Sequence, residues 1–168
     1  MKESLKKSFI IMISVILLSL TVCSSKENIE PSISITAEIT SVNEQQFQAI
    51  GTTGIEKPCK NDFEIFKFCL HEKDYNNLKN RESLVPDFKK IFNNYRDDLY
   101  WFGHSSIQDN ENINLAKYSY DITLYRRGLD EASLRKILNS KEVTISWSTE
   151  DGQQKKKSYK VGDLLRFK

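Results

Sequence analysis

The sequence is poor in the residues that mark several specialised classes of protein. Its 168 residues include only three cysteines, three prolines, six glycines and two histidines. So little proline and glycine excludes a collagen-like or low-complexity chain. The two histidines form no H-E-x-x-H pattern, no serine lies in a G-x-S-x-G context, and the cysteine and histidine spacing matches no zinc site. We therefore expect no metal, no other cofactor and no enzyme of a familiar class.

An excess of charge of one sign is also lacking. The formal net charge is +2, and Lys2, Lys6 and Lys7 against Glu3 account for all of it. Nucleic-acid binding depends on clustered basic residues that neutralise phosphates. Because the rest of the chain is neutral, we expect no nucleic-acid partner.

One long apolar run is present, at the N-terminus. Lysines precede the stretch Phe9–Val22, and Cys23 and two serines follow it. A basic start, an apolar segment and small residues after it form the layout of an export signal. The tetrapeptide Leu20-Thr21-Val22-Cys23 resembles the lipobox of bacterial lipoproteins. That resemblance implies that a lipid is attached to Cys23 and that the chain is cut before it, so that the protein contacts the membrane through its N-terminal lipid.

Two other interpretations of this segment remain open. The uncharged run Ser8–Ser25 is close to the lower limit of roughly 17–25 residues for a membrane span, so it is also compatible with an uncleaved anchor. The third interpretation is an ordinary secretory signal. All three place the following residues outside the cytoplasm, at the cell membrane or cell envelope. We expect a signal peptide over residues 1–22, a flexible tether over 23–32 and a single globular domain over 33–168.

Cys59 and Cys69 form an even pair in a chain that is expected to be exported. This predicts a disulfide that closes a short loop, with a stabilisation on the order of 3 kcal/mol. The alternative is two free thiols.

Alternation of apolar and polar residues predicts strands in the first half of the domain. Residues 33–40 alternate with a period of two, and 63–70 is apolar on both faces, as in a central strand covered on both sides. Residues 47–53 are interpreted as a partner of the first strand. The polar segment 74–83 is expected to be exposed, and 105–114 is expected to be a polar loop.

A helix is predicted between these two polar segments. Apolar residues recur at helical spacing from Leu84 to Leu99, Pro86 suits a first turn and Gly103 suits an exit. We expect the helix to cover 86–101.

The last third of the chain predicts strand, short helix, strand and hairpin. Residues 118–125 and 143–149 alternate as strands, and Asp130 is expected to cap a helix with Leu129 and Leu134 in a hydrophobic staple. For the hairpin, a three-residue loop with Gly152 in a left-handed conformation keeps the apolar residues on one face. This register pairs Trp147 with Lys155, Ile145 with Lys157 and Val143 with Tyr159.

These elements predict a mostly β domain with small helices. We expect a two-sheet β-sandwich with an immunoglobulin-like leaning, in which the strands 118–125 and 143–149 are neighbours. The alternative is an α+β fold, an antiparallel sheet with the 86–101 helix packed across it.

The function expected from the sequence is a non-catalytic binding or interaction module at the cell envelope, with an unknown protein or envelope polymer as its partner. A structural, assembly or immunity-type envelope lipoprotein is the alternative. A hydrolase with an unfamiliar site is the last possibility, and it requires His71 or His104 in a cleft with a serine or carboxylate. The candidate interaction surface consists of Trp101, Phe102, Lys155, Lys156 and Lys157.

Overall fold

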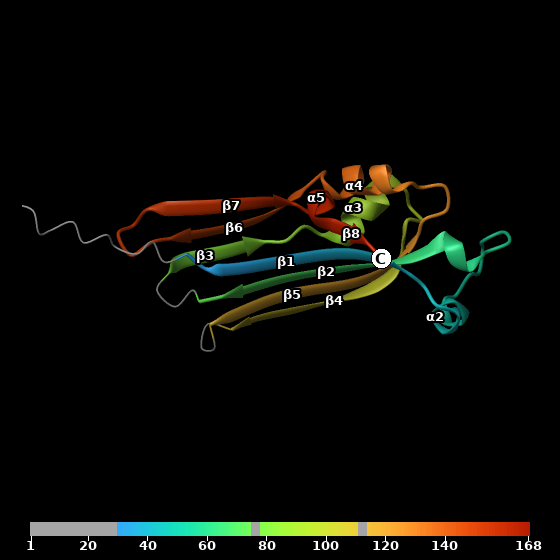
Figure 1. The fold of residues 1–168 in the computed structure, drawn as a ribbon, viewed down its shortest axis with the longest axis horizontal. Coiled ribbons are helices and arrows are strands. Elements are labelled where there is room, and N and C mark those ends of the chain that lie inside the picture. Colours follow the sequence, from blue (N-terminus) through green and yellow to red (C-terminus); the bar gives the residue numbers. More distant parts are fainter. Residues whose placement is uncertain (1–29, 75–77, 111–113) are drawn as a thin grey trace, which may run out of the picture.

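Two β-sheets lie one above the other, and most of the helices gather at one end of the molecule (Figure 1). The structure is a computed structural model that describes residues 30–74, 78–110 and 114–168. The prediction of a mostly β domain with two sheets and small helices is confirmed.

The larger sheet has five strands in the order β4-β5-β2-β1-β8. They are β1 (Ser32–Ser41), β2 (Phe63–Lys73), β4 (Tyr100–Asn110), β5 (Leu115–Tyr125) and β8 (Leu165–Phe167). All pairings are antiparallel except that of the short β8 with β1. The expected central strand is therefore β2, between β1 and β5.

The smaller sheet has the antiparallel order β3-β6-β7, with β3 (Lys79–Leu84), β6 (Glu142–Ser148) and β7 (Gln154–Lys160). The expectation that strands 118–125 and 143–149 are neighbours is wrong, because β5 and β6 belong to different sheets. The helix between them carries the chain across from one sheet to the other, which sequence adjacency does not reveal.

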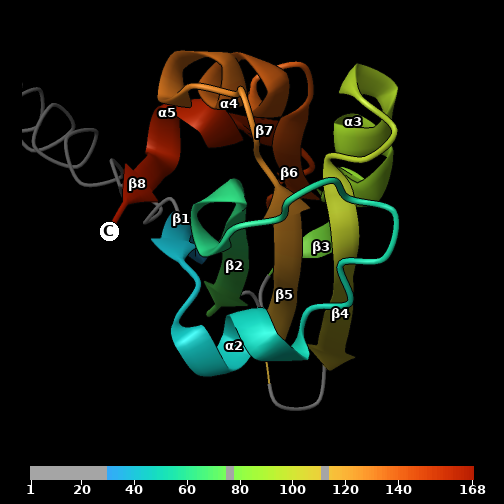
Figure 2. The same ribbon diagram turned by 90° about the vertical axis from the view of Figure 1, so that its right-hand side faces the viewer.

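Four short helices complete the described part of the chain: α2 (Glu44–Ala49), α3 (Phe88–Tyr95), α4 (Glu131–Leu138) and α5 (Val161–Leu164). A 3-10 turn, η1, covers Lys60–Asp62. Figure 2 shows α3, α4 and α5 on the side of the smaller sheet and α2 on the opposite side. None of the helices in the described ranges has the length and apolar character that crossing a membrane requires.

Two predicted elements differ from the structure because of local capping. The strand expected over 47–53 is wrong, since α2 extends to Ala49 and residues 50–53 form no strand. Asn43 caps that helix: its Oδ1 accepts a hydrogen bond from the backbone N–H of Gln46 at 2.8 Å, and its own backbone N–H donates to Gln46 Oε1 at 2.8 Å. The 86–101 helix is shorter than expected: Asp87 caps it, and it ends at Tyr95.

Both of these polar segments contain strands. β3 occupies part of 74–83, and β4 extends to Asn110 through the segment expected as a loop over 105–114. Gly103 lies within β4 rather than at a helix exit. A Cβ there would lie 2.6 Å from the backbone oxygen of Asp121 on β5, so the close approach of the two strands requires glycine.

The main core lies between the sheets. Phe66, Phe68 and Leu70 of β2 and Val143, Ile145 and Trp147 of β6 are all buried in it. The α3 helix extends this core at one end, where Phe88 and Phe92 contact the Phe66 ring at centroid distances of 5.1 and 5.5 Å. On its other face β2 is covered only at its beginning, where Phe63 and Ile65 enter a second cluster with Tyr125.

The predictions for the last third of the chain are otherwise confirmed. Asp130 caps α4 by accepting the Ser133 N–H at 2.8 Å, and Leu129 and Leu134 are buried. The hairpin has the expected register, with Trp147 opposite Lys155, and Gly152 has φ of 85°. A local signal, the alternation of side chains around one glycine, was sufficient to specify this turn.

Candidate interaction surface

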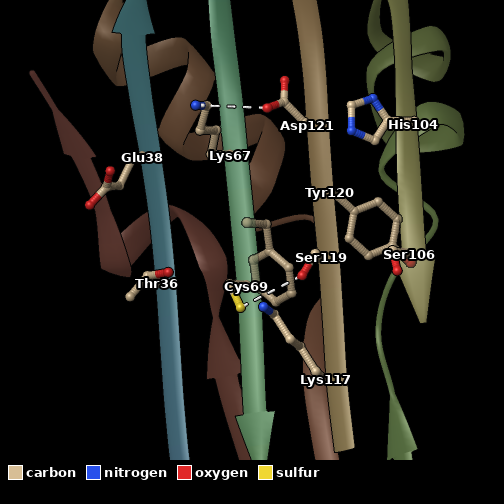
Figure 3. Close-up of a pocket in the computed structure, with 11 residues that line it drawn as sticks. Thr36, Glu38, Lys67, Cys69, His104, Ser106, Lys117, Ser119, Tyr120 and Asp121 are labelled. Carbon is tan, nitrogen blue, oxygen red and sulfur yellow. Dashed lines mark hydrogen bonds and ion pairs between the residues drawn. The ribbon is translucent and has the colours of Figure 1, made fainter. Parts of the chain in front are cut away.

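An open concave region is on the outer face of the five-stranded sheet, which is turned away from the smaller sheet. Strand register places eight side chains there in two rows across β1, β2, β5 and β4. We call these eight residues the polar face: Glu38, Lys67, Asp121 and His104 in one row, and Thr36, Cys69, Ser119 and Ser106 in the next. Figure 3 shows them side by side on neighbouring strands. They line an open hollow of about 420 Å³, to which Lys117 also contributes.

The charges of the polar face are held by weak contacts. Lys67 Nζ lies 3.8 Å from Asp121 Oδ2, and the two side chains are 53% and 41% exposed. Glu38 Oε1 lies 2.7 Å from Nζ of Lys168 at the C-terminus of the chain. Because solvent-exposed ion pairs contribute only about 0–1 kcal/mol, a ligand can replace these partners at low cost.

The two histidines do not form a catalytic arrangement with their neighbours. His104 lines the hollow beside Ser106 and Asp121, but no hydrogen bond joins it to either of them in the described part of the chain. His71 is half-buried further along β2. The thiol of Cys69 lies 3.8 Å from the Ser119 hydroxyl, and neither group contacts a general base. The polar face therefore offers hydrogen-bonding groups and charges of both signs for binding.

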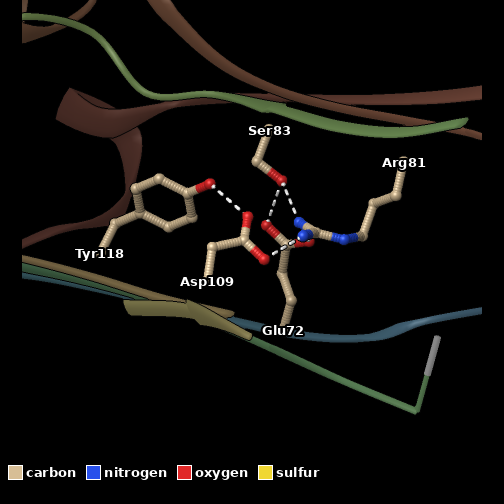
Figure 4. A network of polar contacts seen from close by, with 5 residues as sticks. All are labelled: Glu72, Arg81, Ser83, Asp109 and Tyr118. Carbon is tan, nitrogen blue, oxygen red and sulfur yellow. Dashed lines mark hydrogen bonds and ion pairs between the residues drawn. The ribbon is translucent and has the colours of Figure 1, made fainter. Parts of the chain in front are cut away.

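A second polar cluster lies between the sheets (Figure 4). Glu72 is completely buried and accepts hydrogen bonds from Arg81 Nη1 at 3.1 Å and from Ser83 Oγ at 2.6 Å. Arg81 also donates to Asp109, whose other oxygen accepts the Tyr118 hydroxyl at 3.2 Å. We call these five residues the Arg81 clamp. It joins β3 of the smaller sheet to β2, β4 and β5 of the larger one.

The electrostatics of the clamp are those of a structural ion-pair network. The Arg81 guanidinium holds the pKa of Asp109 below its usual range, and burial raises the pKa of the Tyr118 hydroxyl. The sequence signal that we missed is Glu72 itself. It continues the core-facing positions of β2 after Leu70, and a buried carboxylate at such a position needs a charged partner.

Other shifted carboxyl groups also have structural causes. A hydrogen bond from Arg127 lowers the pKa of Asp62 to about 2, and the two side chains lie 2.6 Å apart. Burial raises the pKa of Glu64, although Arg126 lies 2.5 Å away and opposes the shift. In the described segments, no group of three or more histidine, cysteine, aspartate or glutamate side chains is placed to hold a metal ion.

The predicted disulfide is not present, since Cys59 and Cys69 are free. Cys59 is exposed before the η1 turn, whereas Cys69 lies on the polar face, six residues beyond Phe63 in an extended strand. Six residues of strand span about 20 Å, and a disulfide needs Cα atoms within about 7 Å. Residues 1–29, which include Cys23, the proposed signal and most of the tether, lie outside the described residues.

The candidate interaction residues lie in two separate places. Trp101 and Phe102 are on β4, and the lysines are on β7 of the other sheet. Trp101 is partly buried: its ring packs 6.0 Å from that of Phe63, and its Nε1 donates to the Gly51 carbonyl at 2.9 Å. Phe102 is 48% exposed.

The lysine run is divided between the faces of its strand, as expected for a period of two. Lys155 and Lys157 lie on the side of Trp147, and Lys156 points to the opposite side. Lys157 also forms an ion pair with Glu30 at 2.5 Å. The five residues therefore do not form one continuous patch.

No protein-family model matches the chain. No curated protein sequence matches it either.

Proposed function

We propose that this chain is an exported, lipid-anchored, non-catalytic binding module of the cell envelope, and that it binds its partner through the polar face. The lipobox-like tetrapeptide ending at Cys23 supports the anchoring. The observation that carries the binding function is the open hollow lined by Lys67, Asp121 and neighbouring hydroxyl groups on a sheet that the clamp and the core hold rigid.

The chemistry of the polar face supports a partner with charges of both signs. Lys67 Nζ and Asp121 Oδ2 lie 3.8 Å apart and both side chains are exposed to solvent. A carboxylate of a partner can therefore pair with Lys67, and an ammonium group can pair with Asp121. The hydroxyl groups of Thr36, Ser106 and Ser119 supply further donors and acceptors in the row next to that pair. A protein surface or an envelope polymer with alternating charge has these properties, whereas nucleic acid has only anionic groups along its backbone.

The anchoring is tested by the intact mass of the protein extracted from membranes with detergent. We expect a chain that begins at Cys23 and carries a diacylglyceryl group. In the Cys23→Ala variant this mass should be absent, and the chain should carry no diacylglyceryl group. A wild-type mass that retains Met1 would contradict the lipid anchor and favour the uncleaved segment.

The binding is tested by a photoreactive residue at position 36, on the strand of the polar face furthest from the β4 edge. In intact cells we expect a crosslinked product that is not a dimer of the chain, and we expect a several-fold lower yield when Lys67→Glu is introduced. A photoreactive residue at position 156, on the exposed side of β7, is the matched control. Absence of a product at position 36, or an equal yield of the same product at position 156, would contradict binding through the polar face.

A further inference from the structure

The strand β4 has a free edge of unusual composition. It is the terminal strand of the five-stranded sheet, and β5 is its only strand partner within the described residues. The backbone of 105–109 makes no hydrogen bond in the described structure other than those with β5. From Phe102 to Gln108 the strand contains no lysine, arginine, aspartate or glutamate. An uncharged free edge is a template for pairing with another strand.

An exposed apolar side chain stands on this edge. Ile107 is 62% exposed, and its position opposite Tyr118 places it on the inner face of the sheet, on the same side as the clamp residue Asp109. Four residues along the same strand, Gly103 lies opposite Ile122 and therefore belongs to the same face. Gly103 has no side chain to cover the surface there, and a hollow of about 190 Å³ is present, lined by Tyr100, Tyr120 and Ile122 and also by Asp87 and Lys89.

The Ile107 side chain of one copy and the hollow at Gly103 of another lie opposite each other in one pairing register. When two copies of a strand pair antiparallel about a two-fold axis, directly opposite residues lie on the same face. An axis through Ser105 places Ile107 of each copy opposite Gly103 of the other, Ser106 opposite His104, and Gln108 opposite Phe102. An axis through His104 instead places two histidines opposite each other, and an axis through Ser106 places Ile107 opposite Ser105.

We infer that two copies of this chain associate by antiparallel pairing of their β4 strands about a two-fold axis at Ser105, with Ile107 of each copy in the Gly103 hollow of the other. No like charges meet between Phe102 and Gln108. The pairing joins the two five-stranded sheets into one, with both polar faces on the same side. The dimer therefore presents two binding hollows to one partner, although the pairing itself does not depend on the proposed binding function.

The pairing is tested by cysteine crosslinking of the full chain in membranes. All variants are made in a parent chain in which the two free cysteines are replaced, by Cys59→Ser and Cys69→Ser. This parent chain retains Cys23, and its own dimer yield is the baseline for the comparison. Directly opposite Cβ atoms lie about 4.5–5.5 Å apart, so Ser105→Cys should give a disulfide-linked dimer on mild oxidation. Gln108→Cys alone should not, because the two copies of residue 108 would be about 20 Å apart.

A double variant tests the register. Phe102→Cys combined with Gln108→Cys should restore the dimer that neither substitution gives alone. Lys156→Cys, on the exposed side of β7, measures dimers formed by random collision. A Ser105→Cys yield no higher than that of Lys156→Cys would overturn the pairing, and a higher yield from His104→Cys or Ser106→Cys than from Ser105→Cys would overturn the register.

A second measurement avoids engineered cysteines. In sedimentation of the detergent-extracted chain, Ile107→Lys should weaken self-association at least tenfold, while Ile107→Val should retain most of it. Because Ile107 is exposed within one copy, the substitution should leave the unfolding transition unchanged at concentrations where the chain is monomeric. Lys67→Glu should reduce crosslinking from position 36 without changing the dimer, so that failure of the binding proposal and failure of the pairing are distinguishable. A wild-type chain that sediments as a monomer at all concentrations would overturn the inference.

Discussion

The two sheets end in edge strands of opposite character. The β7 edge of the smaller sheet carries Lys155, Lys156, Lys157 and Lys160, whereas β4 of the larger sheet has no charged residue from Phe102 to Gln108. Lysines on an edge strand discourage pairing with a second sheet, because like charges would meet and the side chains would lose their hydration. The contrast indicates that one edge is protected as ordinary surface and that the other is available for a partner strand.

The remaining edges follow the protected pattern. β3 carries Lys79, Arg81 and Glu82, and β8 is only three residues long. β4 is thus the long edge without such protection in the described structure. The following experiments test the contacts that hold β4 in the sheet and the lysines that distinguish β7 from it, beginning with the largest expected effect.

The Arg81→Ala substitution should have the largest effect on stability. It leaves the fully buried Glu72 without its cationic partner and releases β3 from β2 and β4. Removing one member of a buried ion pair typically costs about 3–5 kcal/mol, and chemical denaturation of the full chain should show a loss of this size. Glu82→Ala, at the exposed neighbouring position, is the control. Equal losses for both variants would contradict a structural role for the clamp.

The Gly103→Ala substitution should have the next largest effect, since it changes β4 itself. The new Cβ would lie 2.6 Å from the Asp121 backbone oxygen and 2.9 Å from the Ile122 Cα, so one strand has to move. Overpacking of this kind costs about 1–3 kcal/mol. Gly51→Ala is the matched control, because no atom lies within 4 Å of its new Cβ. An unchanged unfolding midpoint for Gly103→Ala would show that β4 can move away from β5 freely.

The loss of stability in acid should depend on Asp109, which lies near the end of β4 and pairs with Arg81. Arg81 lowers the pKa of Asp109 in the folded protein, so the stabilisation is complete above the unfolded pKa of about 3.9 and is lost as the pH falls through the lower folded value. Asp109→Asn should therefore reduce the decrease in the free energy of unfolding below pH 4. Denaturation series between pH 7 and pH 2.5 measure this. An acid dependence identical to that of the wild type would contradict the Arg81–Asp109 interaction.

Removing the lysines of the protected edge should have the smallest effect on folding. Lys156→Thr with Lys160→Thr changes exposed positions of β7, where substitutions usually alter stability by no more than about 0.5 kcal/mol. The expected change is in association: light scattering should increase with protein concentration, as the β7 edge becomes more like β4. A variant with unchanged scattering would show that the lysines do not protect this edge.

Local patterns predicted the elements whose geometry depends on neighbours in the chain. The β6–β7 hairpin register followed from side-chain alternation and from Gly152, and the start of α4 followed from Asp130. The same kind of reasoning missed α2, although Asn43 and Gln46 form a capping box, because an apolar residue at Phe47 was read as part of a strand. Local signals were present there and were given too little weight.

The polar face and the Arg81 clamp were beyond local reasoning. The segment 105–110 is polar and has no period-two apolar pattern, so only its pairing with β5 makes it a strand. The members of the clamp lie on four strands, and their partners are set by the way the two sheets stack. The disulfide prediction failed for a related reason, because an extended strand separates two cysteines that are close in sequence.

By itself, the sequence determined the period of most strands, the caps and turns, the chain neutrality after the N-terminal lysines and the lipobox-like resemblance at Cys23. These properties depend on residues within a few positions of one another, where backbone geometry limits the choices. Only the tertiary structure decided which strands share a sheet, which charges meet in the clamp and which edge remains free. Those features arise from contacts between distant segments, and burial of apolar surface between the sheets, rather than any local preference, brings these segments together.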